Sequence, residues 1–509
     1  MAPRFNHRNR GQGLFISVNL DQQIQAGTFE HTLDFLVDNR LDLSIFHHKY
    51  CNATTGRPAY DPALLLKIVL MAYSRGITGS RPIAAACREN TLFMALAEDT
   101  RPHWTTISDF ISGSREEIIQ LFHQVLMICD QTGLIGKQMF AIDGCKLPSN
   151  ASKEWSGTHE NLRKKSKKID RAVRYILDKH REEDQKGEND HSIRQREEQQ
   201  IETLLKASDK IDRFLKENAK RTGRSGKEVQ SNITDNDSAK MMTSHGVVQG
   251  YTGVAAVDAK HQVVVHAEAF GTGDEHGLLE PMLDGIKDNL EDEDILQSSQ
   301  VLADSGFHSK ETLTRLEDEG IDAYIADTRF RSRDPRFATA GRHKPLVPLK
   351  PRTSGRFTPE DFRADIEKRT CICPAGKAMW LRCDKAKITG RLFLQFQAHQ
   401  ADCDSCHLRR QCLQSPKQKG ARQVNILLGT LPKTKNSPLW RMKEKIDSTL
   451  GRHIYSQRLG IVEPVFGHLR HNLGLTRFSL RGREKVDGQW KLMAMLHNLT
   501  KIHRYGLAT

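Results

Sequence analysis

Two aspartates follow short apolar runs that have the length and composition of buried β-strands. Asp143 closes the run 139–142 and precedes Gly144, and Asp304 closes the run 300–303. Side chains at the carboxyl ends of strands in an α/β sheet face the crevice where ligands bind. Paired carboxylates repel each other unless a cation lies between them, and their hard oxygen atoms select Mg²⁺ or Mn²⁺. Two such ions can activate an oxygen nucleophile and stabilise the leaving oxygen of a phosphodiester.

Neither aspartate is sufficient evidence by itself. A single aspartate after a strand forms a turn more often than it binds a ligand. A two-metal site also needs a third carboxylate, which must come from elsewhere in the chain. The interpretation therefore depends on the other segments.

The composition favours a polyanionic partner. The chain has 509 residues and a formal net charge of +14, with 77 Lys and Arg against 63 Asp and Glu. Such an excess indicates nucleic acid before an anionic membrane surface. No apolar run approaches the roughly 20 residues of a spanning helix, and no secretory signal pattern precedes the first core-like segment. We therefore expect a cytoplasmic protein with no membrane partner.

The first 135 residues have a helical pattern. Helix start signals occur at 61–62, at 79–80 and at 103–104, and good helix formers follow them. Short helices joined by polar turns are typical of helix-turn-helix DNA-binding proteins. An all-α packing domain without a DNA contact is the alternative.

Residues 136–330 alternate between strand and helix patterns. A hairpin is predicted over 250–270 and a helix over 275–290, and further helix and strand patterns follow the second aspartate. This order predicts an α/β core with a mixed sheet. The charged segment 153–230 interrupts it, and we interpret that segment as a solvated helix pair or helical insertion.

Residues 331–430 are rich in Pro, Arg and Cys. Six of the ten cysteines crowd into this stretch, namely Cys371, Cys373, Cys383, Cys403, Cys406 and Cys412. Cys403 and Cys406 have the spacing of a metal knuckle, and Cys371, Cys373 or Cys383 could complete a tetrahedral Zn²⁺ site. A compact lobe of reduced, unligated thiols is the alternative. The last segment, 431–509, is helical in pattern and strongly basic, so we expect it to carry a nucleic-acid face.

The ordered set of motifs resembles a known family. Segments 61–67 and 104–107, the two aspartate strands 141–144 and 302–307, and the C-terminal stretch 461–470 occur in the order found in bacterial insertion-sequence transposases of the DDE class. The resemblance covers nearly the whole chain. It implies a ribonuclease-H-like mixed-sheet catalytic core of class α/β, with an all-α N-terminal DNA-binding domain and two insertions.

The resemblance also implies roles for individual residues. Asp143, Asp304 and Glu463 would bind two Mg²⁺ or Mn²⁺ ions and form the catalytic triad. The residues expected to contact DNA are Tyr455, Arg458 and Arg470 beside the glutamate, with Thr105 and Thr106 in the N-terminal helices.

Three features depart from the family pattern. Four residues instead of three separate Arg458 from Glu463, and Arg470 stands where a lysine is common. Pro464 lacks a backbone N–H, so it predicts that a helix begins or kinks at Glu463.

The function implied is transposition of DNA. The protein would bind terminal inverted repeats and target DNA, cleave strands and transfer a 3′-hydroxyl, acting at the nucleoid. Because two ends must be held together, we expect a dimer or a larger assembly. One alternative is a ribonuclease-H-like nuclease without strand transfer. Another is a non-catalytic DNA-binding regulator, which predicts a broken triad.

Overall fold

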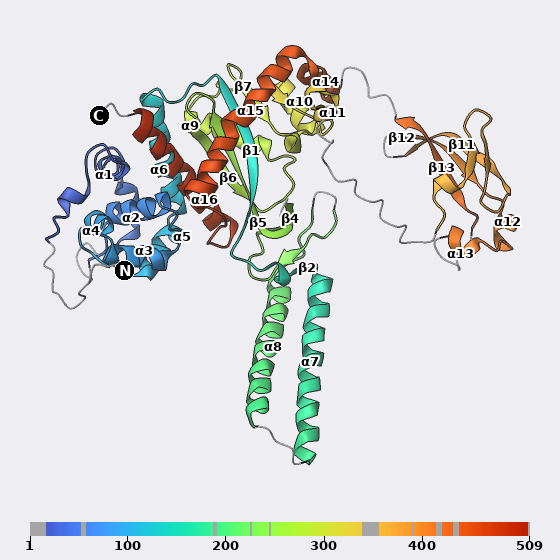
Figure 1. Cartoon of the computed structure of the whole chain (residues 1–509), viewed down its shortest axis with the longest axis horizontal. Coiled ribbons are helices and arrows are strands. Elements are labelled where there is room, and N and C mark those ends of the chain that lie inside the picture. The colour runs from blue at the N-terminus through green and yellow to red at the C-terminus, as the bar shows by residue number, and fades with distance from the viewer. Residues whose placement is uncertain are drawn as a thin grey trace, which may run out of the picture. The chain divides into compact units, whose positions relative to one another are not determined.

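The chain forms two compact units, and a computed structural model describes most of its length (Figure 1). The described residues are 17–51, 58–186, 191–223, 226–243, 246–337, 356–388, 391–413, 420–430 and 437–506. The first unit comprises residues 1–330 and 442–509, and the second comprises residues 331–441. Among the described helices, none is long and apolar enough to cross a membrane.

The N-terminal part of the first unit is helical. Its helices are α1 (Phe29–Asn39), α2 (Pro62–Ser74), α3 (Ser80–Glu89), α4 (Thr91–Leu96), α5 (Trp104–Gly113) and α6 (Arg115–Gln131). The three predicted helix starts are confirmed by α2, α3 and α5. Asp61 caps α2 because its carboxylate accepts a hydrogen bond from the Ala63 amide at 2.8 Å. Most of α2 is buried, so it forms the centre of this helical region.

A mixed six-stranded sheet follows, as the sequence predicts. Its strands are β1 (Met139–Pro148), β4 (Ala239–Thr243), β5 (Gly246–Asp258), β6 (Val264–Phe270), β7 (Gln300–Ala303) and β8 (Asp322–Ile325). The order is β4-β5-β1-β7-β8, and β6 also pairs with β5. The pairs β1–β7 and β7–β8 are parallel, whereas β5 is antiparallel to β1, β4 and β6. This mixed α/β arrangement is consistent with a ribonuclease-H-like core.

The expectation that Asp143 ends its strand is wrong in one respect. β1 continues to Pro148 because β5 still pairs with it, with Asp143 opposite Ala255 and Pro148 opposite Gly250. The parallel pairing with β7, however, stops at Ile142 opposite Ala303. Asp143 and Asp304 therefore both lie directly beyond the last rung of the parallel pair.

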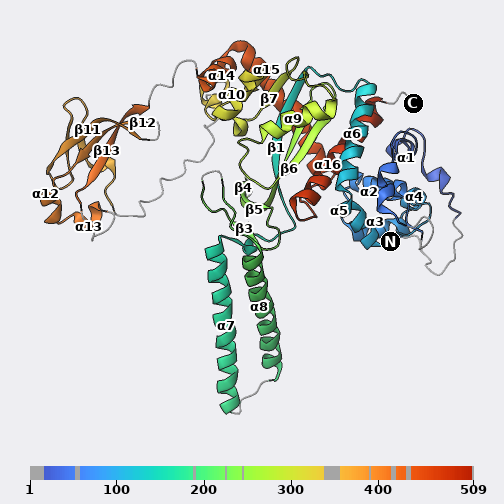
Figure 2. The ribbon, with the colours of Figure 1, turned by 180° about the vertical axis from the view of Figure 1, so that it is seen from behind.

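Helices cover both faces of the sheet (Figures 1 and 2). One face carries α15 (Thr449–Gly467) and α16 (Arg483–Lys501), and the other carries α9 (Leu279–Leu290). The remaining helices in this unit include α10 (Lys310–Asp318), and π-helical turns follow α15 and α16 at His468–Asn472 and Ile502–Gly506.

Trp490 anchors α16 against the sheet. Its side chain is fully buried, and its indole N–H donates to the Val254 carbonyl at 2.9 Å. The indole ring lies against Gly253 of β5, where a Cβ atom would meet it at 2.9 Å. A glycine at this position therefore lets the helix approach the strand closely.

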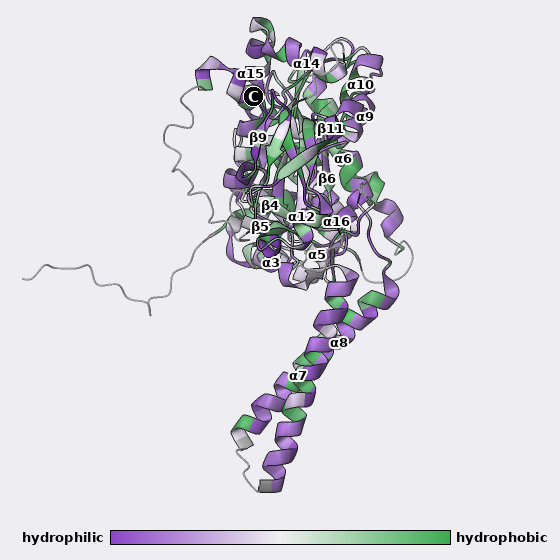
Figure 3. Ribbon diagram, turned by 90° about the vertical axis from the view of Figure 1, so that its right-hand side faces the viewer, coloured by the Kyte–Doolittle hydropathy of each residue, from purple (hydrophilic) through white to green (hydrophobic). Residues whose placement is uncertain are grey.

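Two long helices occupy the charged segment. α7 (His159–Lys186) and α8 (His191–Glu217) pair as a hairpin next to the short strands β2 (Ser156–Gly157) and β3 (Ser231–Asn232). Their surfaces are largely hydrophilic (Figure 3). A small cluster of Leu162, Ile211 and Phe214 packs between them. This burial is enough to pair the helices while leaving most of their length in solvent.

In its described residues, the second unit contains a five-stranded antiparallel sheet and several short helices. Its strands are β9 (Arg363–Asp365), β10 (Thr370–Ile372), β11 (Ala378–Ile388), β12 (Arg391–Gln397) and β13 (Gln423–Thr430), in the order β13-β12-β11-β10-β9. The helices include α12 (Gln400–Asp404) and α13 (Arg409–Cys412). A compact core of Phe362, Met379, Leu394, Phe396 and Val424 packs on one face.

Replacing Trp490 with alanine should lower the free energy of unfolding by about 3–5 kcal/mol, since it leaves a large cavity and removes the hydrogen bond to Val254. Denaturant titration measures this loss. Trp104→Ala is the matched control, because Trp104 is 36% exposed and contacts Arg81 only through a cation–π interaction. Equal losses in the two variants would contradict the anchoring role of Trp490.

Candidate active site

Asp143 and Asp304 share one cation from α15. The Arg458 guanidinium lies between them, with Nη1 2.6 Å from Asp143 Oδ2 and Nη2 3.5 Å from Asp304 Oδ1. The Arg458 side chain is only 7% exposed, whereas the two aspartates are 22% and 39% exposed. The structure thus brings together two of the three predicted triad members and one predicted DNA contact.

Burial and the neighbouring charges set the protonation of this cluster. Burial raises the pKa of Asp143 above its usual value, Arg458 and the Gly144 amide oppose that shift, and Asp304 adds to it. Burial lowers the pKa of Arg458, but Asp143, Tyr455 and Asp304 outweigh it, so the net shift is upward. The guanidinium therefore stays charged and compensates two carboxylates that would otherwise repel each other.

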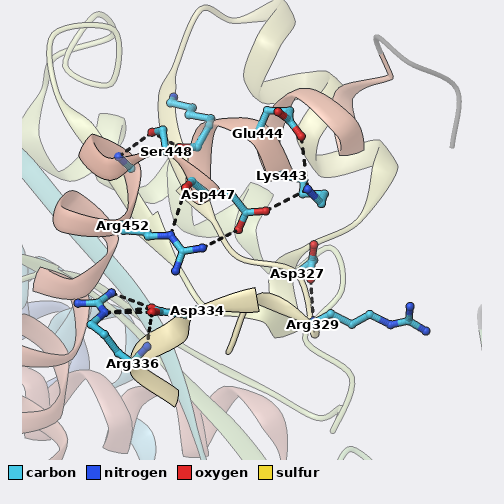
Figure 4. Close-up of polar contacts among 11 residues, drawn as sticks. Asp327, Arg329, Asp334, Arg336, Lys443, Glu444, Asp447, Ser448 and Arg452 are labelled. Atoms are coloured by element: carbon cyan, nitrogen blue, oxygen red, sulfur yellow. Dashed lines mark hydrogen bonds and ion pairs between the residues drawn. The ribbon is translucent and has the colours of Figure 1, made fainter. Parts of the chain in front are cut away.

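Contacts at the start of α15 hold the helix that carries Arg458. Ser448 caps the helix, because its hydroxyl accepts a hydrogen bond from the Gly451 amide at 3.0 Å. Asp447 lies just before the cap and pairs with Lys443 at 3.0 Å and Arg452 at 3.7 Å (Figure 4). These contacts hold the start of α15 in place ahead of the active-site residues.

α15 does not begin at Glu463, contrary to the expectation from Pro464. The helix runs from Thr449 to Gly467 with Pro464 inside it. Pro464 cannot donate to the carbonyl of Gly460 four residues earlier. That carbonyl instead accepts a hydrogen bond from the side-chain amide of Gln262 at 3.0 Å. A tertiary contact therefore offsets the lost helical bond.

Glu463 is less closely tied to the aspartates than Arg458 is. It follows Arg458 by five positions on α15, so the two side chains leave different faces of the helix. Glu463 is exposed, and its carboxylate has no ion-pair or hydrogen-bond partner among the described residues. Over the same residues, no three His, Cys, Asp or Glu side chains are arranged so that they could hold a metal ion.

A carboxylate that the sequence reasoning missed lies beside the aspartates. Glu275 is 16% exposed, and its Oε1 lies 3.5 Å from Lys146 Nζ. A Cβ atom on Gly306 would collide with the Glu275 carboxylate, and one on Gly144 would lie 3.8 Å from it. Burial raises the pKa of Glu275, Lys146 opposes this shift, and Asp143 and Asp304 increase it. In the sequence, the glycines that follow the two aspartates, Gly144 and Gly306, were the signal that another side chain could approach there.

The other predicted DNA contacts lie in two places. Tyr455 is next to Arg458, whose guanidinium carbon is 5.7 Å from the centre of its ring. Arg470 is exposed in the π-helical turn after α15, and it partly opposes the rise that burial causes in the pKa of Cys145. Thr105 and Thr106 are half-buried on α5, where the Thr105 hydroxyl pairs with His103.

The six clustered cysteines do not share one environment. Cys373, Cys403, Cys406 and Cys412 line one small cavity of the second unit. Cys371 is buried in the core of that unit, with its sulfur 3.9 Å from Met379 Sδ. Cys383 lies on β11 and does not line the cavity.

Two families match this chain. Residues 372–503 match the family described as Transposase DDE domain, and residues 18–113 match the one described as Transposase domain (DUF772). The chain therefore carries two segments that are similar to transposase domains. A search of curated proteins found no match. The DDE match includes Arg458, Glu463 and Arg470, whereas Asp143 and Asp304 precede its first residue.

A DDE transposase domain implies catalytic transposase activity, DNA binding and use of a divalent metal. The donor chemistry of the site fits such an ion. Asp143, Asp304 and Glu275 supply hard oxygen atoms around a small region in which Arg458 provides the positive charge.

Replacing Arg458 with methionine should destabilise the metal-free transposase by about 3 kcal/mol at about pH 8, because two carboxylates lose their buried partner. The loss should shrink towards about pH 5. Without Arg458 the pKa of Asp143 rises further, so the folded chain binds more protons than the unfolded chain between the ordinary and the raised pKa. Stability then falls as the pH rises through this window.

Chemical denaturation at the two pH values measures this effect. Arg483→Met is the control, because Arg483 is 54% exposed and its pair with Glu268 should contribute less than about 1 kcal/mol. A loss for Arg458→Met that does not change with pH would contradict the assigned charge compensation.

Proposed function

We propose that this transposase binds the ends of an insertion element, cleaves them and transfers the freed 3′-hydroxyl to target DNA. Asp143, Asp304 and Glu463 are the residues that hold the Mg²⁺ or Mn²⁺ ions. One observation carries the proposal: aspartates beyond two adjacent parallel strands meet Arg458 of the helix on which Glu463 lies. The match to the DDE domain over that helix supports it.

The protein residues have separable tasks in this reaction. Bound divalent ions would supply activation of an oxygen nucleophile and neutralisation of charge on the phosphodiester. Asp143 and Asp304 would hold the ions from the sheet side, beyond the ends of β1–β7 parallel pairing. Arg458 stabilises the carboxylates before ions bind, and its planar guanidinium can then donate two hydrogen bonds to a phosphate.

DNA binding would use two surfaces of the first unit. Tyr455 and Arg470 flank the acids along α15 and the turn after it. Thr105 and Thr106 lie near the start of α5, a position from which the second helix of a helix-turn-helix contacts bases. Holding two element ends at once requires a dimer or a larger assembly on double-stranded DNA.

A nuclease without strand transfer would use the same acids. Supplying pre-cleaved ends with a target plasmid separates the two functions, since only a transposase joins them. A non-catalytic regulator would not need the acids, and all three are present.

Asp143→Asn, Asp304→Asn and Glu463→Gln should each lower cleavage of element ends by on the order of a thousandfold or more, because each removes a charged metal ligand. End binding, measured by gel shift, should remain close to that of the wild type. Glu293→Gln, an exposed change in the same unit, should retain full cleavage. Full activity in one of the three variants would remove that residue from the triad.

A further inference from the structure

Four cysteines of the second unit converge on one cavity. Cys373 follows β10, Cys403 lies in α12, Cys406 follows that helix, and Cys412 ends α13. All four line the same cavity, whose exposed lining is almost entirely apolar. Four thiols gathered from three segments in one cavity match the donor set of a structural zinc centre.

The turn after Cys373 is built to present its sulfur. The Gly376 amide donates to the Cys373 carbonyl at 2.8 Å, and the Lys377 amide donates to the Cys373 sulfur at 3.4 Å. Gly376 has a φ of +79°, which favours glycine. The turn therefore fixes the position of the Cys373 sulfur just ahead of β11.

The other cysteines are also held by basic residues. Arg409 donates to the Cys403 carbonyl at 2.6 Å, and Arg422 donates to the Cys412 carbonyl at 3.1 Å. Both arginines line the cavity.

We propose that Cys373, Cys403, Cys406 and Cys412 bind one structural Zn²⁺ ion. The four sulfur atoms do not form a coordination shell as they stand in the described residues. Each sulfur, however, moves by rotation about a single χ1 bond between staggered positions. The ion would tie the two short helices α12 and α13 to the end of β10, and thereby support a unit whose apolar core is small.

Metal analysis of the full chain, purified without chelator, tests this proposal. We expect about one zinc per chain, and Cys403→Ser or Cys412→Ser should lower the content below about half an equivalent. Cys383→Ser is the matched control and should keep its zinc. A wild-type content below about half an equivalent, or an equal loss in the control, would overturn the proposal.

A second measurement covers the case in which the serine variants fold poorly. Cobalt(II) added to the wild-type chain should give the absorption bands of a tetrahedral tetrathiolate site, and zinc should displace them. In parallel, a thiol reagent should find the four cavity cysteines protected until a chelator is added. Cobalt bands of an octahedral oxygen site, or disulfides among these cysteines, would refute the zinc centre.

A second, independent observation concerns the active site and rests on the proposed function. Gly306, two positions after Asp304, lacks a side chain where the carboxylate of Glu275 lies, and a Cβ atom on Gly144, directly after Asp143, would be 3.8 Å from that carboxylate. Glu275 precedes α9, so it reaches the aspartates from a different element than Glu463 does. We infer that Glu275 is a further acidic ligand of the metal site.

Titration of the DNA-free chain with Mn²⁺, followed by electron paramagnetic resonance, tests this role without relying on activity. Glu275→Gln should weaken Mn²⁺ binding at least tenfold, whereas Glu280→Gln, at a half-buried residue that pairs with Arg315, should leave it unchanged. An affinity within twofold of the wild type for Glu275→Gln would overturn the role of Glu275.

The outcomes for Glu275 and for the proposed function are distinguishable. A wild-type chain that binds Mn²⁺ through Glu275 but neither cleaves nor joins element ends would refute only the transposition reaction. A Glu275→Gln variant that joins element ends normally would refute only the role of Glu275 as a metal ligand. A wild-type chain that binds no Mn²⁺ would overturn the metal assignment for all of these acids.

Discussion

The contact between Arg458 and the two aspartates is the constraint on which the active site depends. Asp143 and Asp304 are carried by adjacent parallel strands, so the sheet forces their carboxylates towards each other. Burial raises the pKa of Asp143. Without a positive charge beside them, the ionised carboxylates of Asp143 and Asp304 would repel each other. The guanidinium from α15 supplies that compensation and couples the C-terminal helix to the first strand of the core.

The rest of the first unit can be understood as support for this coupling. Ser448 and Asp447 fix the start of α15, and the Gln262 amide accommodates Pro464 further along the helix. On the same face of the sheet, Trp490 holds α16 against Gly253. The contacts of Gln262 and Trp490 join segments that are far apart in the chain, so the active site forms only when the whole core has assembled.

The chain accommodates two further elements without disturbing this core. The α7–α8 hairpin begins and ends next to the short β2–β3 pair of strands. Its few apolar residues pack the two helices against each other. The second unit has its own sheet and its own apolar core, between β8 and α15 in the sequence. The α7–α8 hairpin and the second unit each bury their own apolar residues. The two aspartates and α15 can therefore be widely separated along the chain.

The sequence by itself determined the local elements and the chemistry of the site. Helix start signals predicted α2, α3 and α5, and apolar runs predicted β1 and β7, because these features depend on neighbouring residues alone. What it could not determine were contacts between distant segments. The length of β1 beyond Asp143 depends on pairing with β5, and the continuity of α15 through Pro464 depends on Gln262. The choice of four cysteines out of six, and the approach of Glu275 to the aspartates, likewise arise only when separate segments pack together. Spacing along the chain specifies residue types, and only tertiary packing decides which of them meet.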